Sequence, residues 1–292
     1  MKGPIFIGGC GSSGTTLLRK MINAHPNIGC GPEMSVFDRP KMYDISISHL
    51  YTLFIRDDFD ELDDLCVYPI RFQPMDKSYC GLSAAGHRRF YYDGEDTDAV
   101  FEELFDNSNS PKEFLQLFFD RWANESGKKR WAEKTPNNIF TAGKILETYR
   151  HGKFINVIRD GRDVVLSLTG RRGTPVYTAI WRWLAATEAG LRMKGHPRFL
   201  TVRYEDLVLQ TESTLKGICS FIGVDYDAAM LDFWKLQLPE DNDSGINPTA
   251  DYGKQPVFEK SIGKWKDEKV NRTIMLQMDF TLRDRLRALK YE

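Results

Sequence analysis

The sequence has almost no net charge, no long apolar run and no paired cysteine motif, and each absence excludes a class of protein. Its 40 basic and 41 acidic residues leave a formal net charge of −1, so no global basic field indicates nucleic-acid binding. No apolar stretch approaches the roughly 18 residues that a membrane-spanning helix requires. We therefore expect no membrane span and no nucleic-acid partner, and any anion site must be local.

The five cysteines form no C-x-x-C pair, and their odd number argues against a disulfide framework and against a zinc ribbon. Such cysteines are typical of buried or free thiols in a reducing compartment. The apolar run at residues 4–7 is too short for the core of a signal peptide. We expect a soluble, cytoplasmic protein, and the sequence predicts no metal site.

Short apolar segments alternate with helical patterns along the 292 residues. Buried strands are predicted at 4–7, 153–158 and 198–203, with a shorter candidate at 131–133. Helical spacing covers 15–24, 111–124, 137–149, 175–193, 212–222 and 226–236, and a helical run also follows Gly161. This alternation predicts one α/β domain over residues 1–292, with a parallel sheet flanked by helices.

Two segments depart from that alternation. Residues 34–110 are expected to be a helical and loop insertion that shapes an acceptor pocket. Within it, 56–65 carries six carboxylates with apolar residues at every third position, as on the solvated face of an amphipathic helix or, alternatively, in a funnel for a cationic acceptor. Residues 87–96 are expected to form a loop. Residues 237–262 predict a long surface loop, and we expect 237–266 to serve as a lid.

A glycine-rich turn follows the first predicted strand and precedes the first predicted helix. Between a strand and a helix, such a turn directs backbone N–H groups inward and adds the positive end of the helix, which together favour phosphate. Glycine is suited to this turn because the backbone visits positive φ there. The candidate phosphate-binding residues are Gly11, Ser12, Ser13, Gly14, Thr15 and Thr16.

The P-loop of nucleoside triphosphatases has a lysine after its second glycine, whereas this sequence has Thr15 at that position. Without that lysine the charge of a γ-phosphate would be poorly neutralised. The turn therefore favours binding of a phosphate over transfer of a γ-phosphate from ATP.

Five blocks of the sequence, in order, resemble the signatures of sulfotransferases, most closely the tyrosylprotein sulfotransferase branch and its bacterial relatives. The blocks are GGCGSSGTTLLRKMINAHP (8–26), EKTP (133–136), VIRDGRDVVLSL (157–168), RYED (203–206) and IGKW (262–265). The resemblance implies a P-loop-type fold and 3′-phosphoadenosine 5′-phosphosulfate (PAPS) as the sulfuryl donor, with no metal required.

The resemblance also assigns roles to residues of the nucleotide site. Arg159, Ser167 and Arg171 match positions that hold the 3′-phosphate, and a guanidinium fork with a hydroxyl suits a phosphate dianion. Ser167 and Arg171 would lie one helical turn apart. Tyr204 matches a tyrosine that contacts adenine. Ser261 and Lys264, with Lys260, lie in the segment that covers the phosphates, whereas we expect Arg162 and Arg172 to be solvated.

In the chemistry that the resemblance implies, Glu33 is the base that takes the proton of the acceptor, and Lys134 contacts the transferring group. His25 and His87 are rival bases, although His25 is expected to cap a helix end. Members of the family usually have Lys or Arg at the position of Ser12. Either Lys134 supplies the missing cation, or Arg19, Lys20 or a residue of the lid reaches in, or the activity is weak.

The leading hypothesis is transfer of a sulfuryl group from PAPS to a hydroxyl, or less favourably an amine, with adenosine 3′,5′-bisphosphate as product. One alternative is an ATP- and Mg²⁺-dependent kinase of a small molecule or nucleotide, because Arg159-Asp160 after a strand imitates a Mg²⁺-binding carboxylate. A second alternative is a non-catalytic nucleotide-binding protein. The acceptor stays open among a small molecule, a sugar and a peptide.

Overall fold

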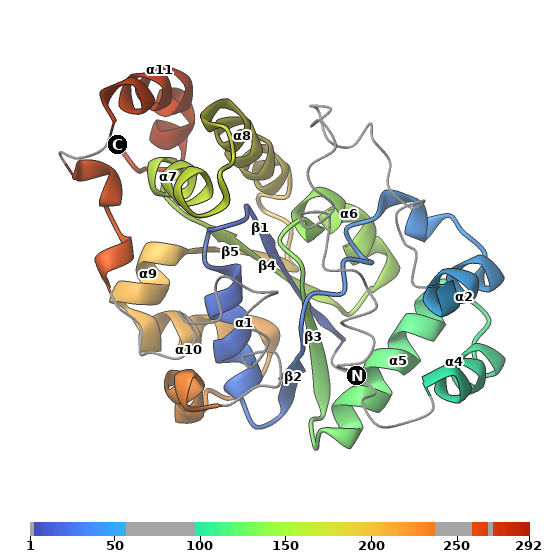
Figure 1. The fold of residues 1–292 in the computed structure, drawn as a ribbon. Coiled ribbons are helices and arrows are strands. Elements are labelled where there is room, and N and C mark those ends of the chain that lie inside the picture. The colour runs from blue at the N-terminus through green and yellow to red at the C-terminus, as the bar shows by residue number, and fades with distance from the viewer. Residues whose placement is uncertain (1–2, 57–96, 237–258, 268–270) are drawn as a thin grey trace.

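The computed structural model describes residues 3–56, 97–236, 259–267 and 271–292. Its centre is a parallel five-stranded sheet in the order β2-β3-β1-β4-β5. The strands are β1 (Ile5–Gly9), β2 (Ile28–Cys30), β3 (Arg130–Lys134), β4 (Lys153–Ile158) and β5 (Phe199–Arg203). The predicted fold class, a parallel sheet flanked by helices, is confirmed (Figure 1).

Helices cover both faces of the sheet because successive side chains of a strand point to opposite faces. In β1, Ile5 and Ile7 pack into one buried cluster and Phe6 packs into the other. The cluster around Ile5 and Ile7 contains side chains of α1 (Thr15–Ala24), α9 (Tyr204–Leu209), α10 (Thr211–Ile222) and the 3-10 segment η3 (Ala228–Lys235).

The cluster around Phe6 is larger and more aromatic. Phe6 packs edge-on against Trp131 and Phe37, with ring centroids 5.6 and 5.1 Å away. This cluster draws on α2 (Ile47–Arg56), α4 (Thr97–Asp106), α5 (Pro111–Glu125), α6 (Asn138–Thr148), α7 (Gly161–Arg172), α8 (Val176–Arg192) and α11 (Arg272–Ala288).

Several elements differ from the sequence prediction. The three-residue β2 is too short to show a period, and α9 and α11 were not predicted. The predicted helix at 226–236 is instead η3, a 3-10 stretch from Ala228 with a kink at Asp232. Within 34–110 the structure contains η1 (Pro40–Tyr43), α2 and α4. The acidic stretch after residue 56, the loop at 87–96 and most of 237–262 lie outside the described residues.

Among the described residues, no helix combines the length and hydropathy needed to cross a bilayer. Cys10, Cys30 and Cys219 are buried free thiols. Because all five strands run parallel, their carboxyl ends lie along one edge of the sheet, where ligands of open α/β folds bind. The predicted site residues follow these ends: Ser12 after β1, Glu33 after β2, Lys134 ending β3, Arg159 after β4 and Tyr204 after β5.

Candidate functional site

The turn between β1 and α1 is shaped to bind an anion. Ser12 has φ 67° and Gly14, at the N-cap of α1, has φ 97°, while the first turn of α1 contains no acidic residue. Successive residues in such conformations aim backbone N–H groups at one point, next to the positive end of a helix. The Ser13 hydroxyl is buried without a hydrogen-bond partner. Thr15 is buried beside it and Gly11 is partly exposed. These donors fit a phosphate group.

Glu33 and Lys134 form an ion pair next to this turn, through Glu33 Oε1 and Lys134 Nζ. Lys134 is almost fully buried, whereas 36% of the Glu33 side chain is exposed. Lys134 Nζ also donates to Thr16 Oγ1 at 3.3 Å. The partly exposed Glu33 carboxylate therefore contacts Lys134, which in turn contacts the first turn of α1. The carboxylate can accept a proton, and the ammonium can stabilise negative charge at the turn.

A buried carboxylate that the sequence analysis did not single out holds the segment bearing Glu33. Glu133 Oε1 accepts hydrogen bonds from Met34 N at 3.2 Å and Thr135 Oγ1 at 2.7 Å, and Oε2 accepts from Asn138 Nδ2 at 2.6 Å. Thr135 Oγ1 in turn accepts from Ser35 N at 3.2 Å. The end of β3 thus fixes both backbone N–H groups that follow Glu33.

Burial raises the pKa of Glu133 to about 7, although hydrogen bonds from Thr135 and Asn138 act to lower it. This shift follows from removing a carboxylate from water without placing a cation against it. The EKTP block pointed to this strand end, but nothing in the sequence distinguishes Glu133 from an exposed glutamate.

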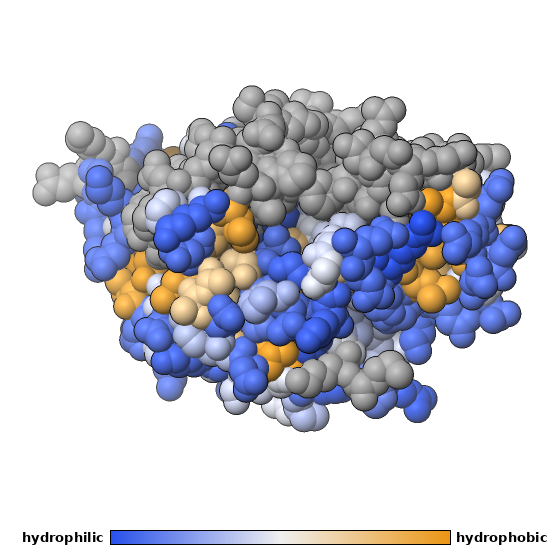
Figure 2. Space-filling view, turned by 90° about the horizontal axis from the view of Figure 1, so that it is seen from below, coloured by the Kyte–Doolittle hydropathy of each residue, from blue (hydrophilic) through white to orange (hydrophobic). Residues whose placement is uncertain are grey.

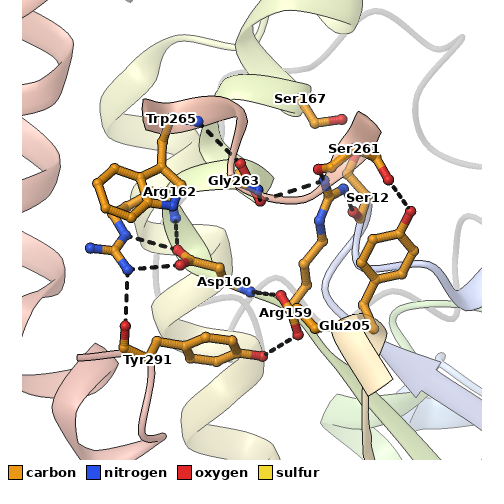
Figure 3. Close-up of polar contacts among 12 residues, drawn as sticks. Ser12, Arg159, Asp160, Arg162, Ser167, Glu205, Ser261, Gly263, Trp265 and Tyr291 are labelled. Atoms are coloured by element: carbon orange, nitrogen blue, oxygen red, sulfur yellow. Dashed lines mark hydrogen bonds and ion pairs between the residues drawn. The ribbon is translucent and has the colours of Figure 1, made fainter. Parts of the chain in front are cut away.

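The residues assigned to the 3′-phosphate lie against the glycine turn. Arg159 Nη1 donates to Ser12 O at 3.0 Å (Figure 3). Arg171 Nη2 lies 3.3 Å from Ser12 Oγ. Arg171 Nε donates to Ser167 Oγ at 3.0 Å, so these two residues share one face of α7. Arg159 is buried and its Nε has no hydrogen-bond partner. Two guanidinium groups and a hydroxyl therefore converge beside the first anion site.

Tyr204 packs between the glycine turn and the late segment of the chain. The guanidinium carbon of Arg159 lies over the Tyr204 ring, 4.5 Å from the ring centroid. The Tyr204 hydroxyl is 2.5 Å from Ser261 Oγ. A Cβ on Gly14 would come within 2.3 Å of Tyr204 Cδ2. Ser261, in η6 (Glu259–Ser261), also accepts a bond from Arg159 Nη2 through its carbonyl. These contacts bring Ser261 to the site, while Lys260 and Lys264 are exposed.

Asp163 anchors this late segment to α7. Its carboxylate accepts hydrogen bonds from Gly263 N at 2.8 Å and Trp265 N at 3.3 Å, and it lies 3.8 Å from Arg159 Nη2. Burial raises the pKa of Asp163, whereas the bond from Gly263 acts to lower it. The residues before and within η7 (Lys264–Lys266) are thereby held over the Arg159 side of the site.

The expectation that Arg162 is solvated is wrong. Arg162 is buried, pairs with Asp160 at 2.7 Å and stacks on Trp265, with its guanidinium carbon 3.7 Å from the ring centroid (Figure 3). It also donates to Tyr291 O at 3.1 Å. The sequence could not show this burial, because Trp265 and Tyr291 lie far along the chain from Arg162, although Asp160 is a near neighbour. The Arg172 side chain lies outside the described residues.

Asp160 is therefore an ion-pair partner of Arg162 and the N-cap of α7, which is not the arrangement of a Mg²⁺-binding carboxylate. Among the described residues no cluster of His, Cys, Asp or Glu could hold a metal ion. The backbone N–H of Asp160 donates to Glu205 Oε1 at 3.0 Å, and Tyr291 Oη donates to Glu205 Oε2 at 3.1 Å. These two partners were not predicted.

His25 ends α1, as predicted, and its ring is engaged there. Its Nδ1 accepts from Asn27 N at 3.1 Å and its Nε2 lies 3.0 Å from Asp225 O. Arg19 is buried and donates to Cys30 O at 3.4 Å, and Lys20 is also buried. His87 lies outside the described residues. Lys134, another of the named candidates, contacts Thr16 in the first turn of α1.

The chain matches the model of a protein family described as the sulfotransferase family over residues 4–228. It is 26% identical to protein-tyrosine sulfotransferase A of Caenorhabditis elegans over 300 residues, which is 99% of this chain and 67% of that protein. It is 25% identical to the protein-tyrosine sulfotransferase of Drosophila melanogaster over 274 residues, which is 89% of this chain and 46% of that protein. The chain thus spans about half to two thirds of the length of these relatives.

Two solved structures have the same fold. The sulfotransferase domain of the Synechococcus PCC 7002 olefin synthase gives a TM-score of 0.62 at 20% identity, covering 96% of this chain and 94% of that one. The sulfotransferase domain of the curacin biosynthetic pathway gives 0.60 at 18% identity, covering 97% and 98%. At these identities the likeness supports the fold class.

Proposed function

Because the chain belongs to the sulfotransferase family, we propose that it transfers a sulfuryl group from PAPS to a hydroxyl acceptor, with Glu33 as the base. The observation that carries this proposal is the ion pair between Glu33 and Lys134, next to Thr16 of the glycine turn. A carboxylate that could accept a proton and an ammonium that could offset negative charge therefore lie beside the glycine turn, which supports the proposal.

The two anion sites support a nucleotide that carries phosphate at both ends of its ribose. Backbone N–H groups after β1, with the buried Ser13 hydroxyl, would hold the 5′-phosphosulfate. Arg159, Ser167 and Arg171 would hold the 3′-phosphate. The unpartnered Ser13 hydroxyl and Arg159 Nε are the buried polar atoms that such a ligand would satisfy. Tyr204 would contact the base.

In the proposed reaction the acceptor oxygen attacks sulfur in line with the departing 5′-phosphate oxygen. A new S–O bond forms to the acceptor while the bond from sulfur to the phosphate oxygen breaks. Glu33 takes the hydroxyl proton, and Lys134 stabilises the negative charge that grows on the departing oxygen. Adenosine 3′,5′-bisphosphate and the sulfate ester are the products. Positioning and charge stabilisation do most of the work, as in phosphoryl transfer.

We propose a protein tyrosine as the acceptor, because relatives that align with 89–99% of this chain are named protein-tyrosine sulfotransferases. Its phenol is more acidic than a sugar hydroxyl, which eases proton transfer to a carboxylate. The location in the cytoplasm stays a prediction from the sequence.

The test is transfer of labelled sulfuryl from PAPS to tyrosine peptides, run beside the matched phenylalanine peptides and a panel of sugar and small-molecule hydroxyls. Label on tyrosine peptides alone supports the whole proposal. Label on another hydroxyl replaces the acceptor but keeps the reaction. Absence of transfer to every acceptor, with adenosine 3′,5′-bisphosphate still bound, overturns the catalytic role in favour of a nucleotide-binding protein.

A further inference from the structure

A second basic pocket lies at the opposite edge of the sheet from the candidate site. It has a volume of about 290 Å³ and is lined by Gly3, Arg130, Arg150, His151, Lys153, Arg198 and Ile222. Arg130 and Lys153 begin β3 and β4, whereas Lys134 and Arg159 stand at the other ends of the same strands. Along β3 the two edges are separated by roughly 13 Å.

The charge of this pocket is uncompensated. Four permanent cations line it and no described lining residue is Asp or Glu. Within the described part of the chain, none of the four forms an ion pair with a carboxylate. The carboxyl ends of α6 and α10 face the pocket, and each contributes a partial charge of about −0.5. The four cations and these two partial charges together give the pocket a net charge of roughly +3.

Two of the four basic residues, Arg130 and Arg198, have a structural role. Arg198 donates to Leu146 O at 2.8 Å and to Tyr149 O at 3.0 Å, which satisfies carbonyls at the end of α6. Arg130 Nη1 donates to Ile222 O at 2.7 Å, at the end of α10. These bonds account for why both arginines are held in place.

The remaining donors have no such role. Arg130 is 92% buried, since 8% of it is exposed, and its Nη2 donates to no described group although its Nε and Nη1 both do. Nη2 is also absent from the fully buried polar atoms that lack a partner, so it keeps some exposure to solvent, and Arg130 lines the pocket. Lys153 lies over the Phe221 ring with Nζ 4.8 Å from its centroid. Arg150 and His151 are exposed at the mouth.

We propose that this pocket is a second anion site, which binds a small ligand bearing phosphate or sulfate groups. The fixed Arg130 Nη2 would donate from the floor, and Lys153 and Arg150 would add charge from the wall and mouth. The volume equals that of roughly ten waters at about 30 Å³ each, enough for a diphosphate group. The site is independent of the proposed catalytic function, since it shares no residue with it.

His151 provides a local probe. Its ring signals, identified by their loss in His151→Gln, are followed by NMR during titration with inorganic phosphate, sulfate, pyrophosphate or adenosine 3′,5′-bisphosphate, each at constant ionic strength. A bound anion changes the electrostatic surroundings of a nearby imidazole ring, so the His151 signals are expected to shift saturably. The four ligands distinguish phosphate, sulfate, diphosphate and nucleotide as the preferred source.

The matched variants are Arg150→Gln with Lys153→Gln and, as control, Lys112→Gln with Arg283→Gln, which remove one lysine and one arginine from exposed positions elsewhere. The first pair leaves the carbonyl bonds of Arg130 and Arg198 intact, so the fold is expected to persist. We expect the affinity for the titrated anion to fall about tenfold in the first pair and to stay unchanged in the control pair. Equal affinity for the anion in both pairs, or His151 signals that never saturate, would overturn the proposal.

Discussion

Glu33 and Lys134 are 101 residues apart in the chain, yet their carboxylate and ammonium groups are in direct contact. They meet because β2 and β3 are parallel neighbours, so the residues that follow Cys30 and end β3 reach the same edge of the sheet. The partly exposed carboxylate therefore lies against an almost fully buried lysine of opposite charge.

Replacing Glu33 by Gln removes the proposed base but keeps the size of the side chain. We expect kcat to fall by a factor of about 10² to 10⁴, the usual contribution of a general base, with little change in affinity for adenosine 3′,5′-bisphosphate. Turnover assays and calorimetry measure the two effects separately. Unchanged turnover would move the base elsewhere, to His87 or another group.

Replacing Arg171 by Gln tests the proposed 3′-phosphate site. Arg171 contacts Ser167 and Ser12 and is exposed, so its loss should not unfold α7. We expect about a tenfold loss of affinity for adenosine 3′,5′-bisphosphate and no change for 5′-AMP. Arg192→Gln, on the exposed face of α8, is the control. Equal losses for both nucleotides would refute the assignment.

Glu133 makes the stability of the protein dependent on pH. Its pKa is raised from 4.5 to about 7 on folding, so the folded state holds the proton more tightly than the unfolded chain. Protonation of Glu133 gives its full contribution to the free energy of unfolding below pH 4.5. This contribution, about 3 kcal/mol in total, is lost as the pH rises to 7.

Urea unfolding at several pH values between 4.5 and 7.5 measures this dependence. Glu133→Gln should remove this component of the slope, whereas Glu102→Gln, at an exposed position of α4, should leave it in place. If the wild type and Glu133→Gln show the same slope, the carboxyl of Glu133 does not titrate in this range.

Gly14→Ala places a methyl group where Tyr204 already lies. The position has φ 97°, and the new Cβ would come within 2.3 Å of Tyr204 Cδ2. We expect a loss of about 1 to 3 kcal/mol of stability, together with weaker nucleotide binding, because the turn and Tyr204 must shift. Gly143→Ala, within α6, has nothing within 4 Å and should be neutral or slightly stabilising. Thermal unfolding of the two variants measures these changes in stability.

Strand and helix positions near the site were largely predictable because their apolar residues repeat with a clear period. Helix α1 has the predicted bounds Thr15–Ala24, and β4 the predicted bounds Lys153–Ile158. The three residues of β2 carry no period, so neighbouring strands alone define it. The helix α11 has a mixed apolar and charged surface, with Phe280 largely exposed, which blurs its pattern.

Burial of charged residues was the part that sequence reasoning missed. Arg162 looks like an exposed cation in the sequence, but it is buried against Asp160. Lys134, which was predicted as a site residue, is also buried, against Glu33. Glu133 and Asp163 are buried acids, and the partners of each include a backbone N–H group of a distant segment. Every residue has a backbone N–H, so the sequence gives no sign of which one will be bound.

The sequence by itself determined the strand–turn–helix at the start of the chain, the glycine-rich character of that turn and the order of the blocks that follow. These are local properties, set by glycine conformations and apolar periods within a few residues. Only the tertiary structure decided that Ser12, Glu33, Lys134 and Arg159 meet. Strand order and parallel direction set those distances, because they bring together chain segments that are far apart in sequence.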